Sequence, residues 1–218
     1  DVARDQRWGR GAEGAGEDVL LSCEFAAARV RGFQGDDLKA DDSLLATPKH
    51  FAAYGAVAAG MEYAQVDISP QTLRDVHLPP FKAALDAGAL SLMSAFNDIN
   101  GVPASANRAL LTELLRHEWK FEGVVVSDYT ADMELIAHGY AADEVDATRK
   151  AFLAGLDLSM QSGFYDQHLA GLVHAGEVPM AVLDASVRRI LRLKEAIGLF
   201  DNPYRSLDPA READQSHI

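Results

Sequence analysis

The chain has 218 residues, 48% of them hydrophobic and 24% charged, which is the composition of an ordinary globular protein and not of a disordered one. Its formal net charge of -13 argues against nucleic acid and anionic membranes as partners, because both would repel it. No run of about 20 apolar residues is present that could span a bilayer. The single cysteine, Cys23, excludes a disulfide within the chain.

The first 17 residues predict a long loop. They are rich in glycine and show no apolar period, while Trp8 argues against disorder. Arg10 lies between two glycines and is placed to reach a polar ligand, although an ion pair with Glu13 or Glu17 fits the spacing equally well. The chain opens on Asp1 with neither a methionine nor a signal peptide, which predicts that a preceding portion is missing or was removed.

A helix and a first strand candidate follow this loop. Residues 18–33 combine an acidic start with apolar residues at helical spacing, and they predict a helix. Residues 44–47 predict a short strand that ends in Pro48-Lys49-His50-Phe51. Lys49 and His50 would point to opposite sides of a continuing strand, so both reach one site only if the chain leaves the sheet there. A surface lysine beside a packed histidine is an equal alternative.

The middle of the chain predicts a second strand between helices. In chain order the pattern indicates a loop over residues 52–68, a helix over 69–88, a strand over 89–96, a turn over 97–103 and a helix over 106–119. The strand contains Met93, a residue type that is more often core filler than a ligand contact.

The next strand ends on a carboxylate. The run Val124-Val125-Val126 predicts a strand that is buried on both faces, as in parallel sheets, and Asp128 follows it closely. Because barrel enzymes gather their active-site residues at the carboxyl ends of strands, Asp128 is placed for chemistry. The alternative, that Asp128 is the N-cap of a helix over 131–138, fits equally well when the residue is taken alone.

The remaining chain continues the alternation of strands and helices. It predicts, in order, helices over 131–138 and 142–153, a strand over 156–160, helices over 168–174 and 181–199, and a linker over 201–218. Four strand candidates alternating with helices are typical of βα units. Since a (β/α)₈ barrel of about 250 residues needs eight strands, the chain is either a small open sheet or the back half of a barrel. The absent methionine and the polar tail favour the half barrel.

Five motifs in order carry a family resemblance. They are Arg7-Trp8-Gly9-Arg10 with Glu17-Asp18, Lys49-His50-Phe51, Met93 to Asn97 with Asn100-Gly101, Val126-Ser127-Asp128, and Arg188-Arg189-Ile190-Leu191 leading to Gly198-Leu199-Phe200-Asp201-Asn202-Pro203-Tyr204. On these motifs the whole chain resembles glycoside hydrolase family 3, in its bacterial periplasmic-type β-glucosidase branch. The resemblance implies an α/β fold in which residues 1–200 are the C-terminal part of a (β/α)₈ barrel, incomplete in this chain. Residues 201–218 would lead to an α/β sandwich domain outside it.

The resemblance also implies an activity. It is that of a retaining β-glucosidase, which releases terminal non-reducing β-D-glucose through a glycosyl-enzyme intermediate on Asp128. Arg10, Lys49 and His50 correspond to residues that hold the hydroxyls of the sugar. The implied substrate is a β-glucoside or cello-oligosaccharide, and neither a metal nor another cofactor is implied.

Three further positions of the sugar site follow from the resemblance. Met93 corresponds to a residue that lines the same subsite. Phe96 falls where relatives often carry a tyrosine, so a hydroxyl donor near the nucleophile is expected to be absent. Tyr129 replaces a common tryptophan, which keeps an aromatic wall but changes its shape.

The acid that a retaining glycosidase requires is not evident in the sequence. Such an enzyme needs a protonated carboxyl group only about 5–5.5 Å from its nucleophile. Glu17, Asp18 and Glu62 are candidates, but Glu17 and Asp18 fit better as helix-start residues. The resemblance implies that the rest of the same polypeptide, or a companion chain, supplies an acid/base glutamate together with the first barrel strands. It also implies a periplasmic or secreted location and leaves a homo-oligomer open.

Two other functions remain open from the residues alone. A lysine at the end of a barrel strand, such as Lys49, is also the nucleophile of Schiff-base aldolases and lyases. A non-catalytic carbohydrate-binding fragment would explain the absence of a convincing acid.

Overall fold

The computed structural model describes residues 1–207 and 209, so residues 208 and 210–218 of the predicted linker lie outside the described part. The helices are α1 (Val19–Gln34), α2 (Pro70–Thr72), α3 (Pro79–Asp86), α4 (Glu134–Ala137), α5 (Glu144–Ala154), α6 (Ala170–His174) and α7 (Met180–Ala196). The strands are β1 (Ser91–Ser94), β2 (Asp98–Ile99), β3 (Val102–Pro103) and β4 (Val124–Ser127). None of the described helices is long and apolar enough to cross a membrane.

Helical segments of other types lie between these elements. Those of π type are η5 (Leu73–His77), η7 (Ala109–Glu118) and η8 (Tyr165–Leu169). Those of 3-10 type are η1 (Gln6–Trp8), η2 (Gly11–Glu13), η3 (Tyr54–Ala56), η4 (Ala58–Gly60) and η6 (Ala104–Ala106).

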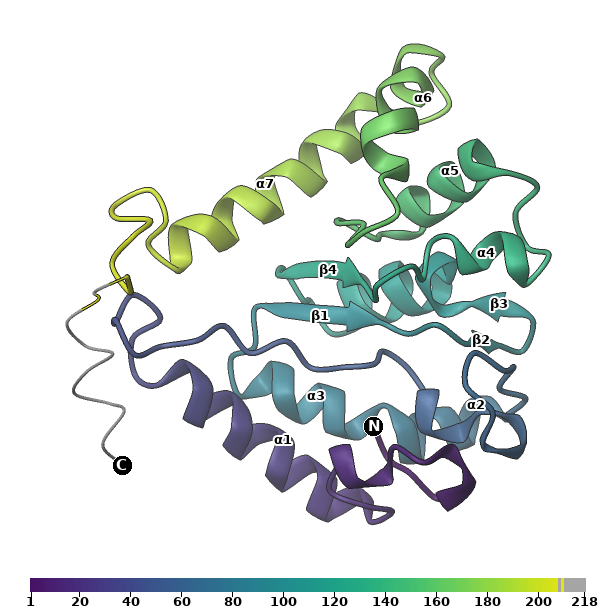
Figure 1. Cartoon of the computed structure of the whole chain (residues 1–218), viewed down its shortest axis with the longest axis vertical. Coiled ribbons are helices and arrows are strands. Elements are labelled where there is room, and N and C mark those ends of the chain that lie inside the picture. The colour runs from purple at the N-terminus through teal and green to yellow at the C-terminus, as the bar shows by residue number, and fades with distance from the viewer. Residues whose placement is uncertain (208, 210–218) are drawn as a thin grey trace.

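The centre of the fold is a parallel pairing of β1 and β4, in which Met93 is the partner of Val126. One parallel bridge on each side extends it, from Phe51 to Ser94 and from Val126 to Leu158. Four segments therefore run parallel and in chain order. In Figure 1 α1 and α3 lie on one side of these strands, and α5, α6 and α7 lie on the other.

The two faces of this small sheet differ in burial. Leu92, Val125 and Leu156 are buried in the main hydrophobic core. Met93 and Val126, which pair with each other, are half-buried, and Leu158 beside them is exposed. One face is thus packed, while the other is open where further strands of a closed barrel would surround it.

Two of the predicted strands are wrong, because neither segment forms a regular strand. Residues 44–47 make no strand pair among the described residues, because the Gln34 and Ser91 side chains bind the backbone N–H and C=O of Ala46. Over 156–160 only Leu158 forms a bridge, since the N–H groups of residues 157 and 158 both donate to the Val125 carbonyl. Side-chain bonds and a shared acceptor replace the regular ladder at both edges.

Other boundaries also differ from the sequence prediction. The helix expected over 69–88 is divided into α2, η5 and α3, and α3 begins at the two prolines, whose rings fit a first helical turn. The turn over 97–103 contains the antiparallel pair β2 and β3. The helix expected over 131–138 is confined to α4. The helices predicted near α1, α5 and α7 are confirmed within three residues at each end.

Asp157 is the anchor of α7 on the sheet. Its side chain is only 1% exposed, and it accepts hydrogen bonds from Arg116 at 2.8 Å and from Arg189 at 2.7 Å. Ser186 and the backbone N–H of Val125 also donate to this carboxylate. Burial lowers the pKa of Arg116 to about 10, and the charge of Asp157 opposes that shift. Every side of the carboxylate is therefore used for structure.

Replacing Asp157 with Asn should destabilise the protein by about 3–5 kcal/mol, because two partly buried guanidinium groups lose their counter-ion. The matched control is Asp184→Asn in α7, whose ion pair with Arg188 is exposed and 3.7 Å long, and which should change stability by less than about 1 kcal/mol. Urea titration would measure both. Similar losses in the two variants would contradict the anchoring role.

Candidate active site

Asp128 lies directly after the carboxyl end of β4. Its Oδ1 accepts the backbone N–H of Tyr129 at 2.7 Å, and its side chain is 14% exposed. Helix α4 begins only at Glu134, with Met133 in the N-cap position, so the alternative of Asp128 as a helix cap is wrong. The carboxylate has a single backbone donor and faces the neighbouring segment that carries His50.

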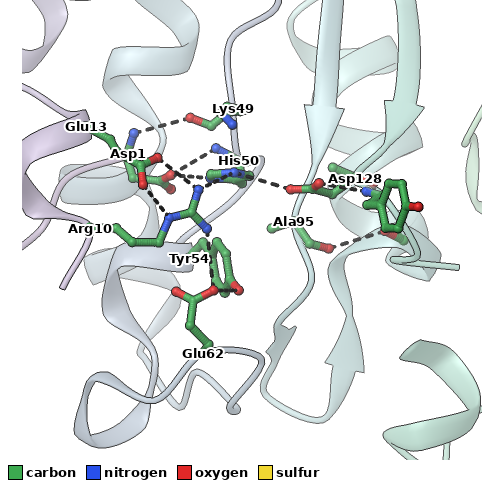
Figure 2. Close-up of polar contacts among 12 residues, drawn as sticks. Asp1, Arg10, Glu13, Lys49, His50, Tyr54, Glu62, Ala95 and Asp128 are labelled. Carbon is green, nitrogen blue, oxygen red and sulfur yellow. Dashed lines mark hydrogen bonds and ion pairs between the residues drawn. The ribbon is translucent and has the colours of Figure 1, made fainter. Parts of the chain in front are cut away.

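His50 lies between two carboxylates, as Figure 2 shows. Its Nδ1 is 2.7 Å from Oδ2 of Asp1, and its Nε2 is 3.3 Å from Oδ2 of Asp128. The ring is 2% exposed and packs edge to face on Tyr54. Burial is the largest influence on the pKa of His50 and lowers it. The charge of Asp128 opposes this shift, while Arg10 acts in the same direction as burial.

Arg10 is held in place by several partners. Its guanidinium lies 5.4 Å from the ring centres of both Trp8 and Tyr54, and its Nη2 is 3.2 Å from Nε2 of His50. Two bonds of 2.8 and 2.9 Å to Glu13 form a bidentate ion pair, which also raises the pKa of Arg10. The ion pair considered from spacing is thus present, and it holds Arg10 against the candidate site.

Lys49 is exposed, and within the described residues no hydrogen bond or ion pair of its ammonium group occurs. It lines a pocket of about 330 Å³ together with Asp1, Arg10 and His50. Its charge also contributes to the lowered pKa of His50. The chain therefore places Lys49 and His50 at one site although they are adjacent in sequence.

The chain is similar to known proteins of one family. The sequence profile of the glycosyl hydrolase family 3 N-terminal domain matches residues 1–193. A periplasmic beta-glucosidase of Salmonella typhimurium is 47% identical over 98% of this chain and 28% of its own length. The crystal structure of a beta-glucosidase from Listeria innocua in complex with glucose has a TM-score of 0.93 and 43% identity, over 96% of this chain and 30% of that one.

This chain belongs to glycosyl hydrolase family 3. The predicted family and the predicted partial (β/α)₈ barrel are both confirmed. The family 3 chain spans about 28–30% of the length of these relatives.

The remaining predicted positions of this family 3 chain differ in exposure. Met93 is half-buried on the open face of β1. Phe96 is largely buried and packs against Tyr54 and Tyr63, with ring centres 5.8 and 4.8 Å apart. Tyr129 is 57% exposed beside Asp128. Ligand contact by Met93, Phe96 and Tyr129 stays a prediction.

Of the three carboxylates considered as the acid, Glu17 is exposed and its side chain makes no hydrogen bond or ion pair among the described residues, whereas Asp18 and Glu62 have partners. Asp18 caps α1 by accepting the N–H of Leu21 at 2.7 Å, as a helix-start residue should. Glu62 accepts a short hydrogen bond from the Tyr54 hydroxyl and lies 3.4 Å from Arg10.

Within residues 1–207 and 209, no three acidic, histidine or cysteine side chains gather where they could hold a metal ion.

Asp1 and Tyr54 were missed by sequence reasoning. Asp1 belongs to a loop without periodicity, and its partner His50 is distant in the chain, so no local pattern marked it. Tyr54 is fully buried between Trp8, His50 and Phe96, and burial raises the pKa of its hydroxyl. A tyrosine shortly after the Lys49-His50 pair was the one available signal.

A buried, neutral His50 predicts sensitivity to acid. Because its pKa in the folded protein is lowered, the unfolded chain binds a proton first as the pH falls below about 6.5, and stability is lost there. His50→Gln removes this titration. The melting temperature should therefore fall less between about pH 7 and about pH 5 in the variant than in the unchanged protein. Parallel curves would show that His50 is not a source of the acid sensitivity.

Proposed function

We propose that this chain is the nucleophile-bearing part of a retaining β-glycoside hydrolase of β-glucosidase type. The observation that carries the proposal is the position of Asp128, at the carboxyl end of β4 and 3.3 Å from His50, in a chain of family 3. Its fixed position, single backbone donor and partial exposure suit a carboxylate that must attack a bound molecule.

The proposed reaction has two displacement steps. Asp128 attacks the anomeric carbon, and the bond from that carbon to the leaving oxygen breaks as the oxygen takes a proton from a carboxylic acid. Water then attacks the anomeric carbon from the side opposite Asp128, the bond between that carbon and Asp128 breaks, and the carboxylate that gave its proton in the first step takes one from the water. The β configuration and both carboxyl groups are thereby restored.

Arg10, Lys49 and His50 are proposed to bind the hydroxyls of the terminal sugar. Arg10 is fixed before any ligand arrives, so ordering it costs little on binding. Lys49 is exposed and can turn toward a hydroxyl, although Asp128 is not among the residues that line the pocket next to Lys49. Met93, Phe96 and Tyr129 would line the rest of the subsite.

The proposed substrate is a β-glucoside or cello-oligosaccharide. The named β-glucosidase relatives and the glucose complex support glucose as the terminal sugar. The periplasmic relative supports a periplasmic or secreted location.

The proposed partner is the remaining polypeptide. Residues 1–200 would be one part of the barrel, with 201–218 leading to a second domain. Leu20, Leu21 and Phe25 of α1 are exposed, as is Leu44 in the following segment, and such side chains are usually covered in a complete fold. We infer that the missing part covers this surface and supplies the acid/base glutamate.

Asp128→Asn should lower turnover of β-glucosides by at least about a thousandfold, because the amide is a poor nucleophile. An activated 2-fluoro-β-glucoside should label a peptide that contains Asp128, as mass spectrometry would show. Lys49→Ala is the control: it should weaken sugar binding but keep the label on Asp128. Label elsewhere would exclude this nucleophile, and trapping of Lys49 with borohydride would support a Schiff-base enzyme instead.

Residues 1–218 alone should fail most on substrates with poor leaving groups. Without the acid, cellobiose hydrolysis should fall about 10²- to 10⁴-fold relative to the full-length polypeptide, whereas a dinitrophenyl glucoside departs without a proton and should lose less. Sedimentation would report whether the exposed surface causes association. A soluble monomer with full activity on cellobiose would mean that the acid lies within these residues.

A further inference from the structure

Asp1 is bound to His50 through one carboxylate oxygen. Its Oδ2 accepts the backbone N–H of His50 at 3.0 Å and lies 2.7 Å from the ring nitrogen Nδ1. The Asp1 side chain is 7% exposed, and the next residues, Val2 and Ala3, are buried. The carboxylate is therefore held rigidly against one edge of the ring.

The contacts of the ring decide which nitrogen carries its proton. A neutral imidazole has one donor and one acceptor nitrogen, and a carboxylate only accepts. At 2.7 Å from Asp1, Nδ1 is the donor. Nε2 is then the acceptor, and at 3.2 Å it faces Nη2 of Arg10, a group that only donates. In the opposite tautomer, an unprotonated Nδ1 would face the carboxylate of Asp1, so two acceptors would meet. A protonated Nε2 would face the guanidinium of Arg10, so two donors would meet.

This tautomer has a consequence for Asp128. Oδ2 of Asp128 lies 3.3 Å from Nε2, but no proton lies between them when Nδ1 carries it. A hydrogen bond from His50 would stabilise the ionised carboxylate in the ground state and so reduce its tendency to attack. By holding the imidazole proton on Nδ1, the contact with Asp1 therefore keeps that proton away from Oδ2 of Asp128.

We propose that Asp1 is a positioning residue, whose carboxylate holds the His50 ring with the proton on Nδ1, so that Nε2 faces Asp128 and the bound sugar as a hydrogen-bond acceptor. The proposal deepens the proposed function and rests on it for the sugar contact. A sugar hydroxyl that reaches Nε2 then shares with Arg10 the single lone pair of that nitrogen, as a hydrogen-bond donor, and accepts no hydrogen bond from His50.

The first test compares Asp1→Ala with Asp1→Asn in the full-length polypeptide. The Asn amide oxygen can accept the same two N–H groups, whereas Ala removes the acceptor. With p-nitrophenyl β-glucoside, Ala should lower kcat about 10- to 100-fold, and Asn should stay within about threefold of the unchanged protein. Asp184→Ala on the surface of α7 is the control. Equal losses in Ala and Asn, or no loss in Ala, would overturn the proposal.

The second test asks in which direction the sugar bond points. The His50→Ala variant first identifies the hydroxyl that contacts His50. Removal of that hydroxyl from glucose weakens inhibition of the unchanged enzyme but not of the variant. At that position the deoxy and deoxyfluoro analogues should inhibit the unchanged enzyme equally weakly, because fluorine donates no hydrogen bond. A clearly tighter fluoro analogue would mean that Nε2 carries the proton and would overturn the proposal.

The third test does not depend on catalysis. ¹⁵N-labelled histidine spectra, with the His50 signals assigned by their loss in His50→Gln, should show a protonated Nδ1 and an unprotonated Nε2. The reverse pattern would refute the tautomer even if β-glucosides are hydrolysed. Conversely, a protein that shows this pattern but does not hydrolyse β-glucosides would contradict the proposed function and not the position of the proton.

Discussion

The parallel pairing of β1 with β4, extended to Phe51 and Leu158, is the constraint on which the other features depend. Parallel neighbours need long crossover connections, so helices must cover the outer face. The same geometry brings the carboxyl ends of successive segments to one edge. His50 and Asp128 meet there although they are far apart in the chain, and the loop that contains Arg10 closes on them from the side (Figure 2).

Two aspartates near the sheet, Asp157 and Asp128, differ in their burial and in the number of their hydrogen-bond donors. Asp157 is almost completely enclosed and has Arg116, Arg189, Ser186 and a backbone N–H as donors, so its carboxylate has no free direction. Asp128 is partly exposed and has one backbone donor. The charge of Asp157 fixes α7 on the sheet, whereas the charge of Asp128 remains available to a ligand.

The candidate site gathers positive charge in a protein that is acidic overall. The net charge is -13, yet Arg10 and Lys49 lie at the pocket beside His50. Glu13 and Glu62 hold the Arg10 fork, and Trp8 and Tyr54 stack against it. A fixed donor such as Arg10 would need no reorganisation if a sugar binds as proposed, and such preorganisation is the usual source of strong electrostatic stabilisation in enzyme sites. The neutral, buried His50 adds polarity without adding charge.

The sequence by itself determined the Val124–Ser127 strand, the carboxylate that follows it and the helices near α1, α5 and α7, because these depend on local periodicity and residue type. It also carried the family motifs. Only the tertiary structure decided that Asp128 does not cap a helix, that Arg10 joins Glu13 and His50 at once, and that Asp1 holds His50. Those outcomes depend on contacts between segments distant in the chain, and no local pattern encodes which partners meet when parallel strands bring loops together.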